Sequence, residues 1–293
     1  VPGSQNPYLY PSASISTMIS NLVNLPTEID YLKVHGAWAS VRSNFAAPAE
    51  NTDAGYLYPY EISPYYSNAG IYNGLPMLTY PGTIINPALA PEISISYEMG
   101  LSMGLLQNRI GLDFAYYNTV DKDHKQKDSK SLASGFEGLF VNANEYTTNG
   151  FEVVLNTTPV LQKDFRWNLA INWDRRITKL TKITTGEDKF NNISEGERVD
   201  NYYATGWLKS PEGQVILSEE TGMPTKDPFP QMFGHQQPDF RFGISNRFKY
   251  NKLTLGIDID GVWGGVIRSL SVEKMWWGGK HPNSTTYRDD EKF

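Results

Sequence analysis

The sequence predicts an all-β protein, and more narrowly a portion of an antiparallel transmembrane β-barrel with long extracellular loops. Three observations support this. Apolar residues recur at every second position in several segments, short and long connections alternate, and glycine and proline occur throughout, with 25 and 18 copies in 293 residues. Period-two alternation is typical of a strand with two unlike faces. Short turns at one end and long loops at the other are typical of outer-membrane barrels.

The clearest predicted strand spans residues 92–105. Its odd-numbered positions, from Ile93 to Leu105, are all apolar, and its even-numbered positions are all polar or small. On an α-helix the same residues would scatter around the axis and give no stripe. A short turn at 106–108 leads to a second alternating segment at 109–117, so these segments predict a hairpin.

Three further hairpins are predicted in the same way. Their strand pairs are 151–155 with 165–174, 240–250 with 253–260, and a weaker pair, 8–19 with 31–42. Long loops are expected between hairpins, at 44–91, 120–145, 176–238 and 265–293. The strands approach or exceed the ~9–11 residues that cross a bilayer at a tilt. We expect about eight to ten strands of a larger barrel.

Composition excludes several classes of function. The chain has no cysteine, which excludes disulfides, thiolate metal sites and cysteine nucleophiles. A net charge of −6 makes nucleic acid a poor partner. No run of 18 apolar residues supplies a transmembrane helix. The mean hydropathy of −0.44 is compatible with a barrel, because barrel strands are apolar only at every second position.

A soluble β-sandwich also alternates, so a secreted all-β carbohydrate-binding module is the alternative. It buries its apolar face inward, whereas a membrane barrel turns that face to lipid. Strand length, the alternation of connections and the aromatic residues near strand ends favour the barrel. Those aromatics are Tyr116, Tyr117, Tyr146, Trp173, Tyr250 and Trp263.

We expect no catalytic residue, metal or cofactor. The four histidines (His35, His124, His235 and His281) form no zinc-protease motif. Asp121–His124 is interpreted as a solvated polar loop. Asp258 and Asp260 lie on one strand face about 7 Å apart, a spacing compatible with a β-rich hydrolase. A wetted lumen wall explains the pair better.

Binding is more plausible than catalysis. Aromatic faces stack on sugars and apolar ligand surfaces, and long loops on a rigid barrel commonly carry binding residues. We therefore expect substrate contacts from loop aromatics, or packing of the same residues against each other or a partner. The candidates are Tyr56, Tyr58, Tyr60, Tyr65 and Tyr66, with Tyr72 nearby, and Trp207, Trp276 and Trp277.

The stretch PALAPEISISYEMGLSMGLLQNRIGLDFAYYNTVDKD resembles the TonB-dependent transporters of the SusC/RagA type found in Bacteroidetes. Its matching phrases are Pro91-Glu92, Glu98-Met99-Gly100, Asn108-Arg109-Ile110, and Tyr116-Tyr117 with Asp121.

Further phrases follow in the family's order. NANEYTTNGFEVVLNTTPV carries Asn142, Asn149, Gly150 and Glu152, with Glu145 where the family usually has glycine. In DYLKVHGAWASV, His35 replaces the usual arginine. The other similar phrases are NPYLYPSASIS, FRWNLAINW, Arg198-Val199-Asp200, SPEGQ at 210–214, and GHQQPDFRFGISNRFKYNKLTLGIDIDG.

The resemblance implies a barrel of about 22 strands closed around a plug, located in the cell outer membrane and surrounded by its lipid. It implies import of an oligosaccharide or peptide, driven by TonB, with a SusD-like surface lipoprotein as partner. Residues 1–293 are then expected to be a C-terminal part of the barrel. The plug, the TonB-binding segment and the final strands are expected outside this chain, and both of its ends are expected to be cuts.

Overall fold

The computed structural model describes residues 8–43, 66–80, 82–86 and 88–285. They fall into two compact units. The first comprises the described residues of Val1–Asp200 and Asp239–Trp263, and the second those of Asn201–Pro238 and Gly264–Phe293. In this described part of the chain, no helix has the length and apolar character needed to cross a membrane.

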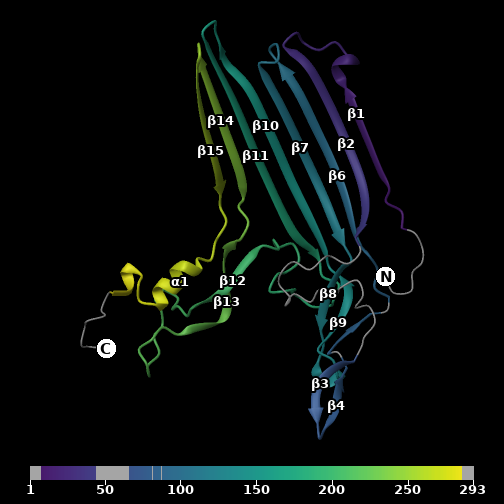
Figure 1. Cartoon of the computed structure of the whole chain (residues 1–293), viewed down its shortest axis with the longest axis vertical. Coiled ribbons are helices and arrows are strands. Elements are labelled where there is room, and N and C mark those ends of the chain that lie inside the picture. The colour runs from purple at the N-terminus through teal and green to yellow at the C-terminus, as the bar shows by residue number, and fades with distance from the viewer. Residues whose placement is uncertain (1–7, 44–65, 81, 87, 286–293) are drawn as a thin grey trace. The chain divides into compact units, whose positions relative to one another are not determined.

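An antiparallel sheet of eight strands, here called the wall, dominates the first unit (Figure 1). Its first and last strands have no outer neighbour among the described residues, so the sheet is an open portion of a barrel. The predicted hairpins are confirmed. In spatial order the strands are β1 (Ser12–Met18), β2 (Ile29–Ser43), β6 (Glu92–Leu105), β7 (Ile110–Lys122), β10 (Glu145–Leu161), β11 (Phe165–Lys182), β14 (Phe240–Tyr250) and β15 (Leu253–Trp263).

The register gives the wall two unlike faces. Directly paired residues on neighbouring strands point to the same side of a sheet. One row across the centre is wholly apolar: Leu101, Phe114, Val153, Trp173 and Phe242. The adjacent row points to the other side and is mostly polar: Ser102, Asp113, Val154, Asn172, Gly243 and Asp260. We call these sides the apolar face and the polar face.

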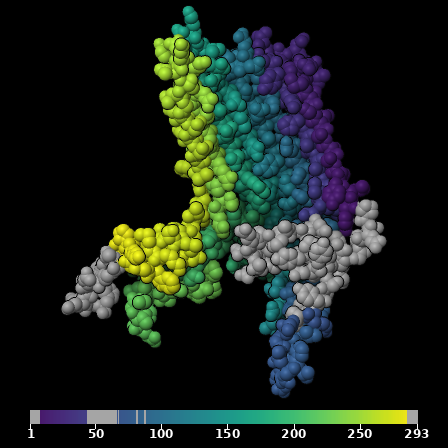
Figure 2. All heavy atoms as spheres, viewed as in Figure 1, coloured from purple at the N-terminus to yellow at the C-terminus, as the bar shows by residue number. Residues whose placement is uncertain are grey.

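The short connections lie together at one end of the wall, the upper end in Figure 1 and Figure 2. The turn after β6 holds Leu106, Gln107 and Asn108 at φ values of 54°, 60° and 57°, and Asn251 between β14 and β15 has a φ of 50°. Left-handed backbone of this kind lets two strands reverse within a few residues. Between β1 and β2 the connection holds a short 3-10 helix, η1 (Ile19–Asn21).

The long connections contain secondary structure of their own, which corrects the expectation of plain loops. The 120–145 region holds the end of β7, β8 (His124–Ser129), η3 (Leu132–Ser134) and β9 (Gly138–Ala143). The 44–91 region holds β3 (Ser67–Tyr72), β4 (Leu75–Thr79) and β5 (Thr83–Ile85). β5 pairs in parallel with β9, which pairs antiparallel with β8.

The second unit corrects the same expectation for 176–238 and 265–293. It contains the antiparallel pair β12 (Asn201–Trp207) and β13 (Lys226–His235), the helix α1 (Leu270–Trp277) and η4 (Pro282–Thr285). Ser269 caps α1, since its hydroxyl accepts from the backbone N–H of Val272 at 3.3 Å. Arg268 donates to the Glu273 carboxylate at 2.7 and 3.0 Å, which adds a charged contact in the first turn.

Burial is concentrated beside the long connections. Residues 82–86, 88–90, 123–148 and 178–199 form what we call the platform. It contains all the buried hydrophobic side chains of the described residues: Leu89, Phe140, Ala143, Leu180 and Ile193. Asn144 and Thr148 are buried there as well.

The wall has no second layer among the described residues. On its apolar face, Met99 of the interior strand β6 is 60 % exposed and Phe151 of β10 is 37 % exposed. A soluble sandwich would cover its apolar face with a second sheet. The secreted carbohydrate-binding module is therefore a poor fit.

Candidate functional site

The polar face of the wall is the first candidate surface. Near its middle, the His35 imidazole on β2 lies 3.3 Å from the Glu98 carboxylate on β6. Gly100 leaves the space that the His35 ring occupies, because a Cβ at that position would collide with the ring. Gly150 does the same for the ring of Tyr117 across the β7–β10 pair. The glycines of two family phrases, E-x-G and N-G, thus let rings lie flat along this face.

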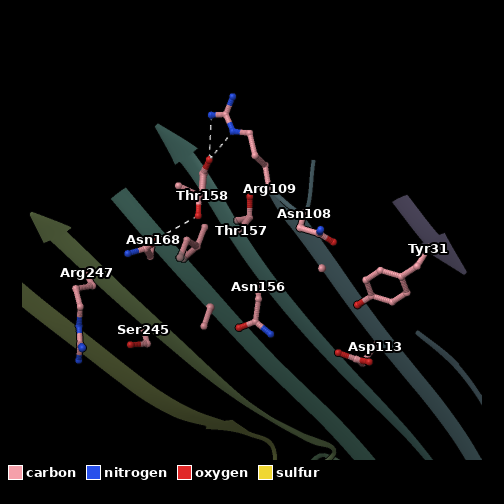
Figure 3. A pocket seen from close by; sticks show the side chains of 13 residues that line it. Tyr31, Asn108, Arg109, Asp113, Asn156, Thr157, Thr158, Asn168, Ser245 and Arg247 are labelled. Carbon is pink, nitrogen blue, oxygen red and sulfur yellow. Dashed lines mark hydrogen bonds between the residues drawn. The ribbon is translucent and has the colours of Figure 1, made fainter. Parts of the chain in front are cut away.

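A hollow of about 510 Å³ opens on the polar face near the short connections (Figure 3). Asp113 of β7, Asn156 of β10, Ser245 and Arg247 of β14, and Tyr31 of β2 line it. Figure 3 shows these side chains gathered from four strands around one space. Both charge signs and several amide and hydroxyl groups are present, so the hollow is suited to hydrogen-bonding a polar chain.

Arg109 closes the upper edge of this hollow and is held firmly. Its guanidinium donates to the backbone carbonyl of Thr158 at 3.0 and 3.3 Å and to that of Pro159 at 2.9 Å. The Thr158 hydroxyl in turn donates to the Asn168 side chain at 3.1 Å (Figure 3). The N-R phrase therefore ties the β6–β7 turn to the end of β10, and Arg109 has a structural role.

Two further carboxylates of this face lie on β15. Asp258 and Asp260 both point to the polar face, through their pairing with Ser245 and Gly243, and both are exposed. This agrees with the interpretation of a wetted wall. No three potential metal ligands gather among the residues that the structure describes.

The platform is the second candidate surface, and amide side chains hold it together. Asn142 donates to the backbone carbonyls of Ala90 and Asp123, both at 2.8 Å, and accepts from the N–H of Ala90 at 2.7 Å. Asn144 has a φ of 61° and exchanges two hydrogen bonds with Thr184 at 2.8 and 3.1 Å. These asparagines give the platform a fixed shape.

Arg198 fastens the platform to the start of β14. Its guanidinium donates to Asp200 at 2.7 and 2.9 Å and to Asp239 at 2.7 Å. These carboxylates, Asp200 first, raise the pKa of Arg198 above its ordinary value against the opposing effect of burial. The R-V-D phrase is thus explained as an ion-pair clamp.

Four of the tyrosine candidates lie outside the described residues: Tyr56, Tyr58, Tyr60 and Tyr65. Tyr66 is described and is 63 % exposed. Its ring lies edge-on to Tyr80 at 5.3 Å, and Tyr80 lies edge-on to Phe136 at 6.1 Å. Tyr72 is also exposed, in the hairpin β3–β4. Sequence reasoning missed Tyr80 and Phe136, because neither is part of a tyrosine cluster or a strand pattern.

The tryptophan candidates all lie in the second unit. Trp207 ends β12, while Trp276 and Trp277 end α1. Trp276 stacks on His281 with a centroid separation of 4.6 Å, and the Lys274 ammonium lies 4.4 Å from the centroid of Trp277. Trp277 is 83 % exposed, more than either of the other two.

The aromatics near strand ends divide between the two faces. The rows containing Tyr116, Trp173, Tyr250 and Trp263 lie on the apolar face. Tyr117 and Tyr146 lie on the polar face, paired with Gly150 and Asp121, so these two aromatics do not face the same side as the rest of the group. The first group includes a stack of Phe240 on Trp263 at 6.2 Å.

Comparison with known proteins agrees with this geometry. The chain is 25 % identical over 236 residues to TonB-dependent receptor P3 of Formosa agariphila, covering 68 % of this chain and 23 % of that protein. It is 27 % identical over 117 residues to TonB-dependent receptor SusC of Bacteroides thetaiotaomicron, covering 39 % of this chain and 12 % of SusC. The chain thus spans less than a quarter of the length of each relative.

Solved structures of RagAB, titled a peptide transporter and a peptide importer, share the fold. One matches with a TM-score of 0.63 at 17 % identity over 86 % of this chain and 29 % of that chain. Its open-open state gives 0.67 at 16 % identity, over 87 % and 28 %. The model of the family described as TonB dependent receptor-like, beta-barrel, a family of outer-membrane receptors and transporters, matches residues 21–290. This chain belongs to that family.

Proposed function

We propose that this chain forms part of the wall of a TonB-dependent importer in the cell outer membrane. The observation that carries the proposal is the two-faced wall, with an uncovered apolar face and a polar face that holds a hydrogen-bonding hollow. An apolar band toward lipid and a polar lumen are what a transport barrel requires. We propose that the plug, the TonB-binding segment and the final strands lie outside these 293 residues.

The substrate we propose is an oligosaccharide or a peptide. SusC is among the relatives, and the RagAB structures that share the fold are those of a peptide transporter. Exposed aromatic side chains near the long connections offer stacking surfaces for either class. We propose Tyr56, Tyr58, Tyr60, Tyr65, Tyr66, Trp207, Trp276 and Trp277 as contacts to the ligand or to the partner.

The partner we propose is a SusD-like surface lipoprotein. SusC is among the relatives of this chain, and a SusD-like lipoprotein is the companion that the resemblance to SusC implies. The platform supports this proposal, because a surface that holds its own shape is preorganised for docking. TonB would act from the other side of the membrane.

The test is to purify the full-length protein from outer membranes in detergent and to identify every co-purifying chain and ligand by mass spectrometry. We expect a SusD-like lipoprotein together with a glycan or a peptide, and the ligand's mass would decide the substrate class. A protein that stays monodisperse without detergent would refute the membrane location. A barrel that arrives alone would refute the partner.

Trp277→Ala tests the loop aromatics in the same preparation. We expect weaker ligand or lipoprotein retention, by about 10-fold if one well-packed aromatic contact is lost. Leu270→Ala is the matched control, since Leu270 is also exposed and lies on the same helix. Equal retention by both variants would remove Trp277 from the site.

A further inference from the structure

A second hollow, of about 730 Å³, lies at the end of the wall that carries the short connections, between the β10–β11 turn and the β14–β15 turn. Its lining combines two kinds of side chain. The apolar ones are Leu161, Phe165, Tyr250 and Leu253. The cationic ones, which we call the turn cations, are Lys163, Arg166, Lys249 and Lys252. This combination is suited to a molecule that has both an apolar and an anionic part.

The turn cations carry a surplus of positive charge. Asp164 is the one carboxylate that lines the hollow, so four cations and one carboxylate leave a net charge of +3. None of the turn cations has an ion-pair partner in the described part of the chain. On the four strands that enter these turns, the nearest further carboxylate is Asp258 of β15, about 17 Å along the strand from Leu253. The surplus is therefore not cancelled by neighbouring acidic groups.

The register brings two of the turn cations directly opposite each other. Arg166 of β11 pairs with Lys249 of β14 on the polar face. Like charges at directly opposed positions of a sheet are destabilising. Arg166 donates to the Asn168 side chain at 2.9 Å, and this neutral partner leaves the charge of the guanidinium in place. An anion bound beside the two turns would relieve the repulsion between Arg166 and Lys249.

The apolar face of the wall continues up to the same turns. Its last two rows are Trp167, Phe248 and Leu255, and then Phe165, Tyr250 and Leu253. Tyr250 is 58 % exposed and Leu253 is 73 % exposed. Lys252 stands between these two in the chain, and Lys163 precedes Phe165 by two residues. Since aromatic belts mark the level where hydrocarbon meets headgroups, we expect the turn cations at headgroup height.

We propose that this hollow binds an anionic phospholipid of the periplasmic leaflet. The short turns of outer-membrane barrels lie on the periplasmic side, and basic side chains at a membrane surface attract anionic lipids. The lipid phosphate would accept from the turn cations, because guanidinium and ammonium groups are strong donors to phosphate. The acyl chains would pack on the rows that end in Tyr250 and Leu253. The inference rests on the proposed membrane location and goes beyond it by assigning a lipid site at the short connections.

The experiment uses the full-length protein in detergent and measures bound lipid by native mass spectrometry. The probes are phosphatidylglycerol, which is anionic, phosphatidylcholine, which carries the same phosphate but no net charge, and inorganic phosphate. The variant K163Q/K252Q changes two exposed residues of the turns, and the matched control K209Q/K226Q changes two exposed lysines between β11 and β14. With two surface cations lost, we expect phosphatidylglycerol to bind about 30-fold more weakly to the variant. Its binding to the control should match the wild type.

Leu253→Asn tests the apolar part of the same site. Leu253 is mostly exposed, so its replacement leaves the wall folded while it removes an acyl-chain contact. We expect phosphatidylglycerol to bind about 10-fold more weakly to this variant. An unchanged affinity would show that acyl chains do not pack on the row of Leu253.

Three further outcomes would overturn the inference. They are equal binding of the two lipids to the wild type, an unchanged affinity in K163Q/K252Q, and displacement of phosphatidylglycerol by inorganic phosphate at similar concentration. The last would show a free-phosphate site. Failure of the proposed membrane location is distinguishable, since the protein would then stay monodisperse without detergent and bind neither lipid. Failure of import alone would leave the lipid affinities as expected.

Discussion

The wall and the platform are built from the same kind of strand but are stabilised in opposite ways. In the wall, large apolar side chains such as Met99 remain 60 % exposed. In the platform, Leu180 is fully buried, and Asn144 is 1 % exposed with its polar groups paired. The wall therefore depends on its surroundings to cover its apolar face, whereas the platform holds its own core. This difference suits a barrel that stays in lipid while presenting a shaped surface to water.

Among the changes that test this difference, Leu180→Ala is expected to lower stability the most. It leaves a cavity in the most buried part of the platform, which costs about 2–5 kcal/mol. Hydrogen exchange should accelerate at 138–148 and 178–199 and stay unchanged at 92–105. The effect should be the same in detergents of different chain length. Uniform acceleration across the whole sheet would show that the platform has no separate stability.

Val153→Arg tests the wall, with Val154→Arg as a control on the neighbouring residue of the same strand. Val153 belongs to the apolar face and Val154 to the polar face. An arginine turned to the middle of the bilayer costs about 2–4 kcal/mol, while one in a wet lumen costs little. Urea unfolding in lipid vesicles measures the difference. If the two variants are destabilised equally, the assignment of the faces is wrong.

Asn144→Ala and Asn144→Gly separate the contribution of the Asn144 hydrogen bonds to platform stability from that of its left-handed backbone. Both lose the hydrogen bonds to Thr184 and Gln126, a loss of about 1–3 kcal/mol for a buried group. Only alanine adds the cost of a φ of 61°. We expect Asn144→Gly to be the milder change in hydrogen exchange at 178–199. Equal effects of the two variants would mean that the backbone conformation contributes nothing.

A pH change gives the smallest expected effect, in the hairpin β12–β13. Asp227 accepts from the N–H of Phe229 at 2.9 Å and from the Gln231 amide at 2.6 Å. These bonds, the first most of all, lower the pKa of Asp227. Its stabilisation is therefore present above the unfolded-state pKa of about 3.9 and is lost as pH falls through the folded-state value. Exchange in 226–235 should accelerate on acidification, and Asp227→Asn should abolish that dependence.

Sequence reasoning found the wall because one side of each strand meets an apolar environment. The alternation in 92–105 and 240–250 gave both boundaries as observed. The strand predicted to end at Tyr117 continues to Lys122 as β7. The prediction ended early because residues 118–122 include Asn118, Thr119 and Asp121 and lose the two-faced pattern. β8, with the sequence HKQKDS, carries no alternation at all.

The candidate sites were less predictable than the fold. Tyr66 was identified as one of several loop tyrosines. Its contact with Tyr80 could not be predicted, because it depends on how the chain folds between the two residues. The hollow around Asp113 and Arg247 joins strands more than 130 positions apart in the sequence. Only the register shows that Arg175 and Lys179 point to the apolar face while Arg176 points to the polar one.

The parallel pairing of β5 with β9 has a consequence for the order of folding. Thr83 pairs with Gly138, so 55 positions separate the two partners and the hairpin β6–β7 lies between them in the chain. Contacts of long sequence separation form late, since the loop between them must close first. We therefore expect β5 to pair with β9 late, so that the platform is completed only after the neighbouring part of the wall has paired. The platform would then take its final shape as the last step in the folding of the first unit.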